Sequence, residues 1–407
     1  MAAREIESPY AWARLAASVA LGTIGGVGMW SIVVAMPAVQ AEFGVDRGEA
    51  SLPYTATMIG FMCGTVVIGR LSDRFGLMLP AMGAVVLLAA GYFATAFAPG
   101  IVSFALLYGA LVGLGGAAMF APLMADISHW FSARRGLAIG LAAAGNYFAG
   151  TLWPPVIEHF IAQAGWRATH IGIAIFCLVT MPLLLLVLRR RATIQPAPVS
   201  ADAGQPAFGS RPLGWPPQLV QGLLVLAGLG CCVAMSMPQV HIVAYCVDLG
   251  YGPARGAQML SLMLGFGIVS RLTSGWILDR IGGLPTLLLG STLQAMALAL
   301  YLPFDGLMSL YVISAIFGLV QGGIVPSYAF IVRELFPASQ AGFRVSLTIS
   351  ATMAGMALGG WMSGAIYDLT GSYQAALLNG ILWNIANMAI AFVLLRRQWR
   401  GRLAAAV

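Results

Sequence analysis

The sequence contains no lysine, and only 9% of its 407 residues carry a charge. Soluble domains have about a quarter charged residues, so this scarcity excludes an ordinary soluble protein. Hydrophobic residues take their place: they make up 59% of the chain, and the mean hydropathy is +0.87. Apolar runs of about twenty residues recur from end to end, and each is long enough to cross a bilayer as a helix. The sequence therefore predicts an all-α protein that crosses the membrane many times.

Other absences narrow the function. The five cysteines form no C-x-x-C pair and fall in or near the apolar runs, so we expect buried small side chains and not metal ligands or disulfides. The chain has no cluster of residues with metal-ligand spacing, no phosphate-binding loop and no nucleophile–base pair. We therefore expect no metal, no cofactor and no enzymatic activity.

Twelve apolar runs are predicted to be membrane-spanning helices. They lie at about 13–36, 50–71, 79–98, 101–125, 136–160, 169–188, 219–245, 256–278, 285–303, 307–332, 343–366 and 373–395. The only long polar break follows the sixth run and is rich in Pro, Ala, Gly and Ser, which is typical of a flexible linker. We predict a six-helix bundle at residues 1–190, a cytoplasmic linker at 191–217 and a second six-helix bundle at 218–407.

The arginines predict the orientation. With the N-terminus inside, the outer loops hold only Arg47, Arg167 and Arg255, whereas the cytoplasmic side holds every other arginine that lies outside a span. Positive residues concentrate on the cytoplasmic side of membrane proteins, so we expect both termini there, in an inner or plasma membrane. The net charge of +7 then reports topology and not nucleic-acid binding. The N-terminal segment does not have the pattern of a cleavable signal peptide, so the first span is expected to remain in the mature protein. We also expect the protein to be a monomer in the lipid bilayer.

A short motif occurs twice, at the end of the second span of each half. GRLSDRFG at 69–76 corresponds to GWILDRIG at 275–282, an offset of 206 residues. The fourth spans also correspond, through GLGGAAMFAP at 113–122 and GLVQGGIVP at 318–326. The chain therefore looks like the duplication of a six-helix unit that many transporters share.

The charged residues of this motif suggest a conformational role. An aspartate is suited to capping the N-terminus of a neighbouring helix, and each arginine is placed to reach an acid at the end of a fourth span. Pairs of this kind would hold one conformation and break in another; the alternative is that these residues only determine topology. The predicted gating residues are Asp73, Arg74 and Asp126 in the first half and Asp279, Arg280 and Glu334 in the second.

The motif, its second copy and the twelve spans in two halves resemble the major facilitator superfamily. Three stretches are similar to its branch of monocarboxylate transporters and oxalate/formate antiporters: HWFSARRGLA at 129–138, HIVAYCVDLG at 241–250, and SRL at 270–272 in the eighth span. The resemblance implies twelve helices in two pseudo-symmetric six-helix bundles and transport of a small organic anion.

Arg271 lies well inside the eighth span, about 10 Å from its cytoplasmic end at 1.5 Å per residue. A charge there is costly, by at least ~2.5 kcal/mol, and no acid lies elsewhere in this span. The other half has Thr65 at the corresponding place, so the repeat does not require a cation. We predict that Arg271 holds a carboxylate bidentately, as the resemblance also implies; the alternative is an arginine that reaches water or a distant acid.

Further residues are candidates for the substrate cavity. The predicted substrate contacts are Trp30, Phe120, Asn146, Tyr147, Gln321 and Tyr328. For each of them the alternative is a role in packing between helices. Phe120 stands where the branch often has a tyrosine. His241 follows Pro238 in the seventh span, and because histidine changes charge near neutral pH it is the candidate proton carrier. A buried structural histidine is the alternative.

The sequence thus predicts a secondary active transporter that moves a small organic monoanion, a monocarboxylate, with a proton by rocking of its two halves. It departs from the branch in having neither a lysine in the first span nor an aspartate shortly before Arg271, so the usual proton relay of the branch is missing. The alternatives are an exporter or antiporter of other small organic solutes and a transport-silent membrane receptor on the same fold.

Overall fold

The computed structural model describes residues 7–132, 134–190 and 212–405, and all regular elements in these ranges are helices. The described chain divides into two compact units. The first holds the described residues before 191 together with Gln239–Gly265, and the second holds the described residues up to Pro238 after the gap together with those from Phe266 onward. The predicted linker lies mostly outside the described residues, and the division into bundles at that linker stays a prediction.

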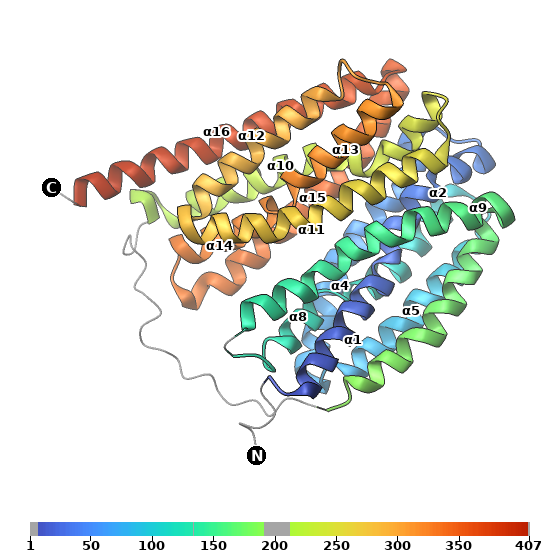
Figure 1. Cartoon of the computed structure of the whole chain (residues 1–407), viewed down its shortest axis with the longest axis horizontal. Coiled ribbons are helices and arrows are strands. Elements are labelled where there is room, and N and C mark those ends of the chain that lie inside the picture. The colour runs from blue at the N-terminus through green and yellow to red at the C-terminus, as the bar shows by residue number, and fades with distance from the viewer. Residues whose placement is uncertain (1–6, 133, 191–211, 406–407) are drawn as a thin grey trace. The chain divides into compact units, whose positions relative to one another are not determined.

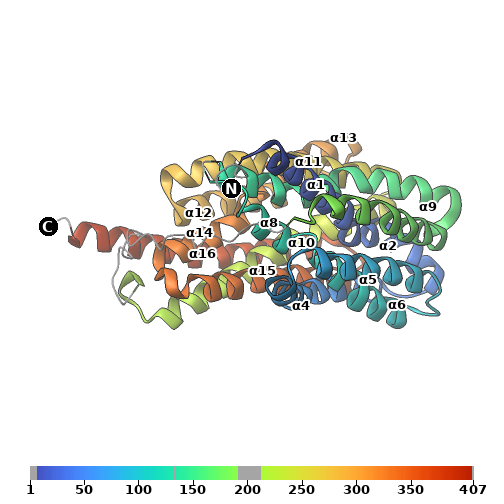
Figure 2. The same cartoon turned by 90° about the horizontal axis from the view of Figure 1, so that it is seen from below.

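The first unit is built mainly from the helices before the gap. They are α1 (Pro9–Gly25), α2 (Val27–Phe43), α3 (Arg47–Ala50), α4 (Leu52–Phe75), α5 (Met78–Ala96), α6 (Ile101–Leu107), a π-helix (Tyr108–Gly113), α7 (Leu114–Ala117), α8 (Ala121–Ile127) and α9 (Arg135–Val187). The long helices α4, α5 and α9 run nearly parallel in two perpendicular views (Figures 1 and 2).

The helices after the gap continue the same plan. They are a 3-10 turn (Pro212–Gly214), α10 (Pro217–Asp248), α11 (Pro253–Ile281), α12 (Gly283–Leu300), α13 (Leu307–Gln321), α14 (Ile324–Leu335), α15 (Ala338–Thr370) and α16 (Tyr373–Ala405). The helices α10 and α11 each contribute to both units, whereas α12 to α16 belong to the second, where α12 packs along α16.

Eleven helical segments of the described chain are long and apolar enough to span a membrane. The longest of them, Leu137–Val187, is broken at Gly165, where φ is 78° and ψ is 164°. A side chain is strongly disfavoured at this φ, so a glycine permits the reversal. Since each part is long enough for a crossing, this segment supplies two spans, and the described residues hold twelve, the number predicted from the sequence.

Several spans of the described chain are divided between successive helical segments, the first, fourth and tenth among them. The first span breaks at Gly26 between α1 and α2, and the fourth breaks at residues 118–120 between α7 and α8. The tenth breaks at Gly322 and Gly323 between α13 and α14. Backbone groups freed by such breaks need partners, so interrupted helices in transporters commonly border binding sites.

Candidate functional site

Arg271 meets the break in the tenth span. Its Nε donates to the carbonyl of Gly322 at 3.4 Å, and the side chain is half-buried. The preceding residue, Ser270, accepts the N–H of Gly322 on its Oγ at 3.0 Å. Two successive residues of α11 therefore satisfy both backbone groups of one glycine, which fixes the cation beside the interrupted helix.

The glycines at the break are required by close packing. A Cβ on Gly322 would lie 2.5 Å from the carbonyl oxygen of Gly267 and 2.8 Å from the amide nitrogen of Arg271. A Cβ on Gly323 would overlap the side chain of Ser274. The small residues Gly267, Ser270 and Ser274 of α11 thus allow this helix to pack closely against the break.

We expect Gly323→Ala to destabilise the second unit, because the added methyl must displace Ser274. Overpacking of this kind costs about 1–3 kcal/mol. The matched control is Gly275→Ala on α11, where no atom lies within 4 Å of the added Cβ and the helix gains intrinsic stability. Thermal unfolding in detergent should be lowered by the first change and not by the second; equal melting temperatures for the two variants would contradict the packing argument.

Tyr328, a predicted substrate contact, takes part in a buried hydrogen-bond network. Its side chain is fully buried, and its hydroxyl donates to Oδ1 of Asn387 at 2.7 Å. The Nδ2 of Asn387 donates in turn to Oγ of Ser291 at 2.8 Å, and Asn384 donates to the Ser291 carbonyl at 2.8 Å. This buried network joins α14, α16 and α12, so the Tyr328 hydroxyl proton is engaged within the protein. Sequence reasoning missed the two asparagines, although both are amides within an apolar span.

Gln321 ends α13 directly before the break. It is completely buried, and it lies one helical repeat from Tyr328 in the sequence, but α13 and α14 are separate helices. What places Gln321 near the candidate site is its position one residue before Gly322, whose carbonyl receives Arg271.

The first unit has a small cavity where its own interrupted spans meet. Gly25, Gly26, Gly28 and Met29 from the first span line it, together with Asn146 of α9 and residues of the second and fourth spans. Its volume of about 20 Å³ holds roughly one water. Next to it, Nε1 of the buried Trp30 donates to the carbonyl of Asn146 at 3.2 Å. Two predicted site residues are thus brought together.

The remaining candidates of the first unit are more dispersed. Tyr147 is half-buried on α9, and its carbonyl accepts from Oγ1 of Thr151 at 2.7 Å. Phe120 lies at the break before α8, with its ring centroid 6.1 Å from that of Phe61. His241 is completely buried in the part of α10 that belongs to the first unit.

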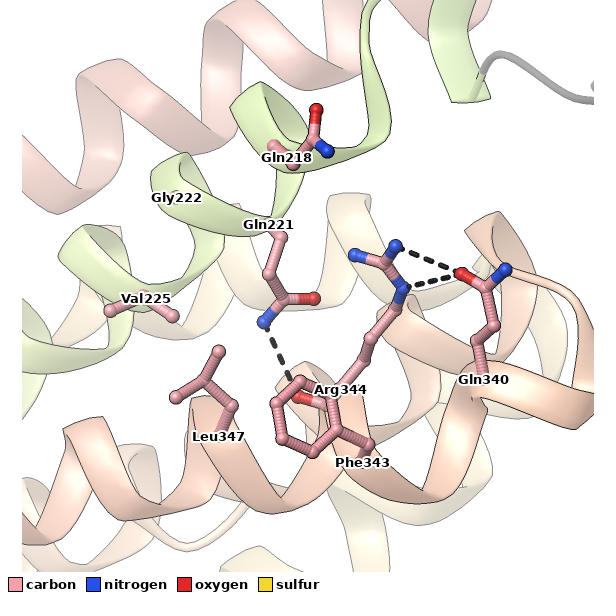
Figure 3. A pocket seen from close by; sticks show the side chains of 8 residues that line it. All are labelled: Gln218, Gln221, Gly222, Val225, Gln340, Phe343, Arg344 and Leu347. Atoms are coloured by element: carbon pink, nitrogen blue, oxygen red, sulfur yellow. Dashed lines mark hydrogen bonds between the residues drawn. The ribbon is translucent and has the colours of Figure 1, made fainter.

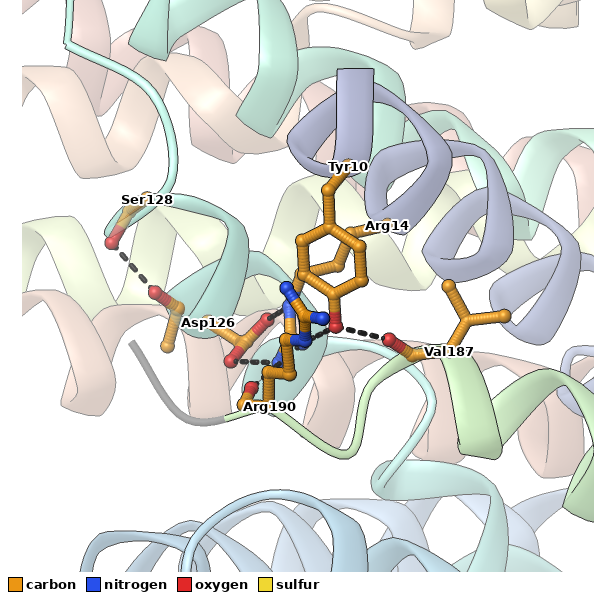
Figure 4. A network of polar contacts seen from close by, with 7 residues as sticks. Tyr10, Arg14, Asp126, Ser128, Val187 and Arg190 are labelled. Carbon is orange, nitrogen blue, oxygen red and sulfur yellow. Dashed lines mark hydrogen bonds and ion pairs between the residues drawn. The ribbon is translucent and has the colours of Figure 1, made fainter. Parts of the chain in front are cut away.

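The acid at the end of the fourth span has a partner that the sequence did not indicate. Both carboxylate oxygens of Asp126 accept from Arg14 of α1, at 2.7 Å and 2.8 Å, and Arg14 is 1% exposed (Figure 4). Nη1 of Arg14 also donates to the carbonyl of Arg190 at 2.9 Å. The predicted pairing of Asp126 with Arg74 is therefore replaced by Arg14, because α1 packs against α8. The Arg74 guanidinium lies 5.2 Å from the Phe75 ring centroid instead.

Two of the predicted gating residues of the second half contact residues at the ends of α11 and α12. Oε2 of Glu334 accepts the N–H of Gly283 at the start of α12, at 3.2 Å, and the Arg280 guanidinium stacks 3.6 Å from the Trp276 ring centroid. Asp279 is exposed at the end of α11. The side chain of Asp73 lies outside the described residues. The gating role of these residues stays a prediction.

Two further ion pairs of the first unit were not anticipated. Arg47 donates to both carboxylate oxygens of Asp248, at 3.0 Å and 3.2 Å, so the end of α10 is tied to α3. Arg167 donates to Glu42 at 2.7 Å and to the carbonyl of Ala96 at 2.6 Å. Among the described residues no group of three or more His, Cys, Asp and Glu is placed to hold a metal ion.

Comparison with known proteins identifies the family. Residues 19–328, more than half of the chain, match the sequence model of the Major Facilitator Superfamily. The chain belongs to the major facilitator superfamily. The fold expected from the duplicated motif is thereby confirmed, and the protein is a multi-pass membrane transporter of this superfamily.

Relatives within the superfamily include monocarboxylate transporters. The chain is 29% identical over 324 residues to monocarboxylate transporter 13 of Bos taurus, which covers 77% of this chain and 73% of the relative. It is 27% identical over 393 residues to monocarboxylate transporter 11 of Homo sapiens, covering 92% and 80%. Among solved structures, a bacterial homolog of the human lysosomal transporter Spinster superposes with a TM-score of 0.72 at 14% identity, covering 96% of this chain and 97% of the other. That likeness concerns the fold alone.

Proposed function

We propose that this superfamily member is a secondary active transporter of a small organic monoanion, a monocarboxylate, and that it moves the anion together with a proton by alternating access. The relatives named as monocarboxylate transporters support the substrate class. The observation that carries the proposal for this chain is Arg271, a guanidinium placed beside an interrupted helix inside a membrane span.

The geometry at Arg271 suits an exchangeable anion. Its Nε bond to Gly322 is 3.4 Å long, whereas N–H···O bonds in proteins are usually about 2.7–3.2 Å. A carboxylate would make shorter, charge-assisted and bidentate bonds with the same guanidinium. A single cation deep in the span matches a single carboxylate. The pair is neutral overall, so the loaded carrier reorients at lower electrostatic cost than the empty one.

The organic part of the substrate is proposed to contact candidates that lie near the interrupted spans. Gln321 precedes the break in the tenth span. Trp30, Asn146 and Tyr147 lie on α2 and α9, near the small cavity of the first unit, and Phe120 lies at the break in the fourth span. We propose His241 as the proton carrier, on the grounds that it is a buried titratable side chain of the seventh span and that the sequence lacks the branch's usual relay residues.

The proposed orientation follows from the arginine asymmetry of the loops. Both termini are proposed to be cytoplasmic, in an inner or plasma membrane, with the carrier acting as a monomer. A cysteine introduced into an outer loop, for example Gly306→Cys, should react with a membrane-impermeant maleimide in intact cells. Labelling only after the cells are opened would reverse the orientation.

Uptake by proteoliposomes tests the transport proposal. A labelled panel of lactate, pyruvate and longer or aromatic acids is offered with and without an inward proton gradient. Coupling of one proton to one anion supports about tenfold accumulation per pH unit, since a pH unit corresponds to ~1.4 kcal/mol. Because undissociated acids also cross lipid unaided, the readout is the initial rate above that of protein-free vesicles. We expect one acid to show saturable, gradient-stimulated uptake that is insensitive to membrane potential. No uptake of any panel acid by folded protein would contradict the proposal.

A further inference from the structure

A groove in the second unit lies well away in sequence from Arg271, between the first turns of α10 and α15. Its volume is about 660 Å³, within the range of small-molecule sites. Each helix presents one face to it, at i, i+3, i+4 and i+7 (Figure 3). The lining residues are Gln218, Gln221, Gly222 and Val225 from α10 and Gln340, Phe343, Arg344 and Leu347 from α15.

The groove changes from polar to apolar along the helices. The first positions of the two faces are glutamines, and the last are Val225 and Leu347. Phe343 is 76% exposed and Leu347 is 40% exposed, on a helix that spans the membrane. Two helical turns separate the ends of each face, about 10 Å at 1.5 Å per residue. This gradient at the end of two spans matches the boundary between headgroups and acyl chains.

The polar end carries a cation and no acid among its lining residues. Nε and Nη2 of Arg344 both donate to Oε1 of Gln340, at 3.1 Å and 2.9 Å, and the guanidinium lies 4.2 Å from the Phe336 ring centroid. Within the described residues Nη1 of Arg344 makes no hydrogen bond. The groove therefore offers a half-buried positive charge with donors available for an anion.

The same end also carries an acceptor without a donor. Gln221 is 6% exposed, and its Oε1 is buried with no hydrogen-bond partner among the described residues. The amide cannot be reversed, because its Nε2 donates to the carbonyl of Arg344 at 3.3 Å and to Oγ1 of Thr348 at 2.9 Å, and a reversed amide would set two carbonyl oxygens together. A buried acceptor left unsatisfied is costly, so this oxygen calls for an O–H or N–H donor from a ligand.

From these contacts we propose that the groove binds a membrane phospholipid whose headgroup combines a phosphate anion with hydroxyl donors. The phosphate pairs with Arg344, a headgroup hydroxyl donates to Oε1 of Gln221, and an acyl chain lies along Val225, Leu347 and Phe343. An ionised carboxylic acid without a hydroxyl, such as octanoate, supplies no donor and so does not satisfy Gln221. The site is independent of Arg271 and of the proposed substrate.

Binding of short-chain lipids to the delipidated full chain in neutral detergent tests this proposal. The probes share one chain length: phosphatidylglycerol, with an anion and hydroxyls; phosphatidylmethanol, with the anion alone; phosphatidylcholine, with no net charge; and octanoate. We expect phosphatidylglycerol to bind about fivefold more tightly than phosphatidylmethanol, which lacks the hydroxyl donors, and about fiftyfold more tightly than phosphatidylcholine, which lacks both the hydroxyl donors and the net charge. Octanoate should also bind more weakly than phosphatidylglycerol.

Variants locate the effect. Arg344→Gln should weaken phosphatidylglycerol binding about tenfold, towards the value for phosphatidylcholine, and Arg344→Lys should retain part of the preference. Arg333→Gln is the matched control, since Arg333 is exposed at the end of α14 and does not line the groove, and Arg271→Gln should leave lipid binding unchanged. Equal affinities for all four probes in the unaltered protein would overturn the proposal without any variant. Tight octanoate binding that depends on Arg344 would also overturn it, in favour of a carboxylate site.

Discussion

Arg271→Gln is expected to abolish transport of the preferred monocarboxylate. Glutamine keeps polarity and similar length but removes the charge, so the carboxylate would lie in the membrane interior without a counter-ion. Loss of one partner of a desolvated charge pair costs about 2–5 kcal/mol, which corresponds to at least ~30-fold weaker binding. The measurement is the initial rate of uptake into proteoliposomes that contain equal amounts of folded carrier.

The control for this prediction lies on the same helix. Arg255 is exposed near the start of α11, where its Nη1 donates to Gln258 at 3.2 Å, and Arg255→Gln should transport at the unaltered rate. Arg271→Lys separates charge from geometry, because lysine keeps the charge but not the bidentate fork. Full uptake by Arg271→Gln would mean that the arginine only anchors the break in the tenth span through Gly322.

The second large effect is expected for stability. Asp126→Asn removes the charge that pairs with Arg14, which is 1% exposed and held by two short bonds. Breaking a buried ion pair by removing one partner costs about 3–5 kcal/mol, because the other charge remains buried. We expect a clearly lowered thermal unfolding temperature in detergent, with the loss arising in the first unit.

A double variant tests the reason for this loss. Arg14→Met combined with Asp126→Leu removes both charges, and replacing a whole buried pair by apolar residues is often neutral. The double variant should therefore be more stable than Asp126→Asn alone. If the two single changes and the double change had additive costs, the pairing of Arg14 with Asp126 would not be the source of the stability.

The sequence was sufficient for the membrane architecture and less so for side-chain partners. Span length, the polar break and the repeated GRLSDRFG motif depend on local composition, which is why the twelve spans and the superfamily could be predicted. Gly165 shows what the sequence could not predict. A turn between the predicted spans at 136–160 and 169–188 was expected, but the residue at which the chain reverses, with φ of 78°, is known only from the structure.

Ion-pair partners could not be predicted because they depend on which helices pack together. Asp126 was matched with Arg74 by analogy with the repeated motif, whereas the contact of α1 with α8 brings Arg14 to the same carboxylate. Similarly, the pairing of Arg47 with Asp248 joins residues 201 positions apart. Charge and sequence position alone do not distinguish such partners.

The breaks in the spans were missed for a related reason. The tenth span was predicted as a single run at 307–332, whereas Gly322 and Gly323 divide it into α13 and α14. The signal was present as paired glycines, which in a membrane helix also serve close packing, and sequence alone does not separate these two uses. Arg271 was predicted as a cavity cation, and the structure adds that it donates to the backbone at this break.

The central claim, that Arg271 holds the carboxylate of the substrate, is tested most directly by equilibrium binding of matched ligands. The best-transported acid and its neutral amide are titrated against the unaltered protein and Arg271→Gln in detergent. The account predicts that the acid binds the unaltered protein at least ~30-fold more tightly than the amide does, and that Arg271→Gln binds the two equally weakly. An undiminished preference for the acid in Arg271→Gln would contradict the account and place the anion site elsewhere.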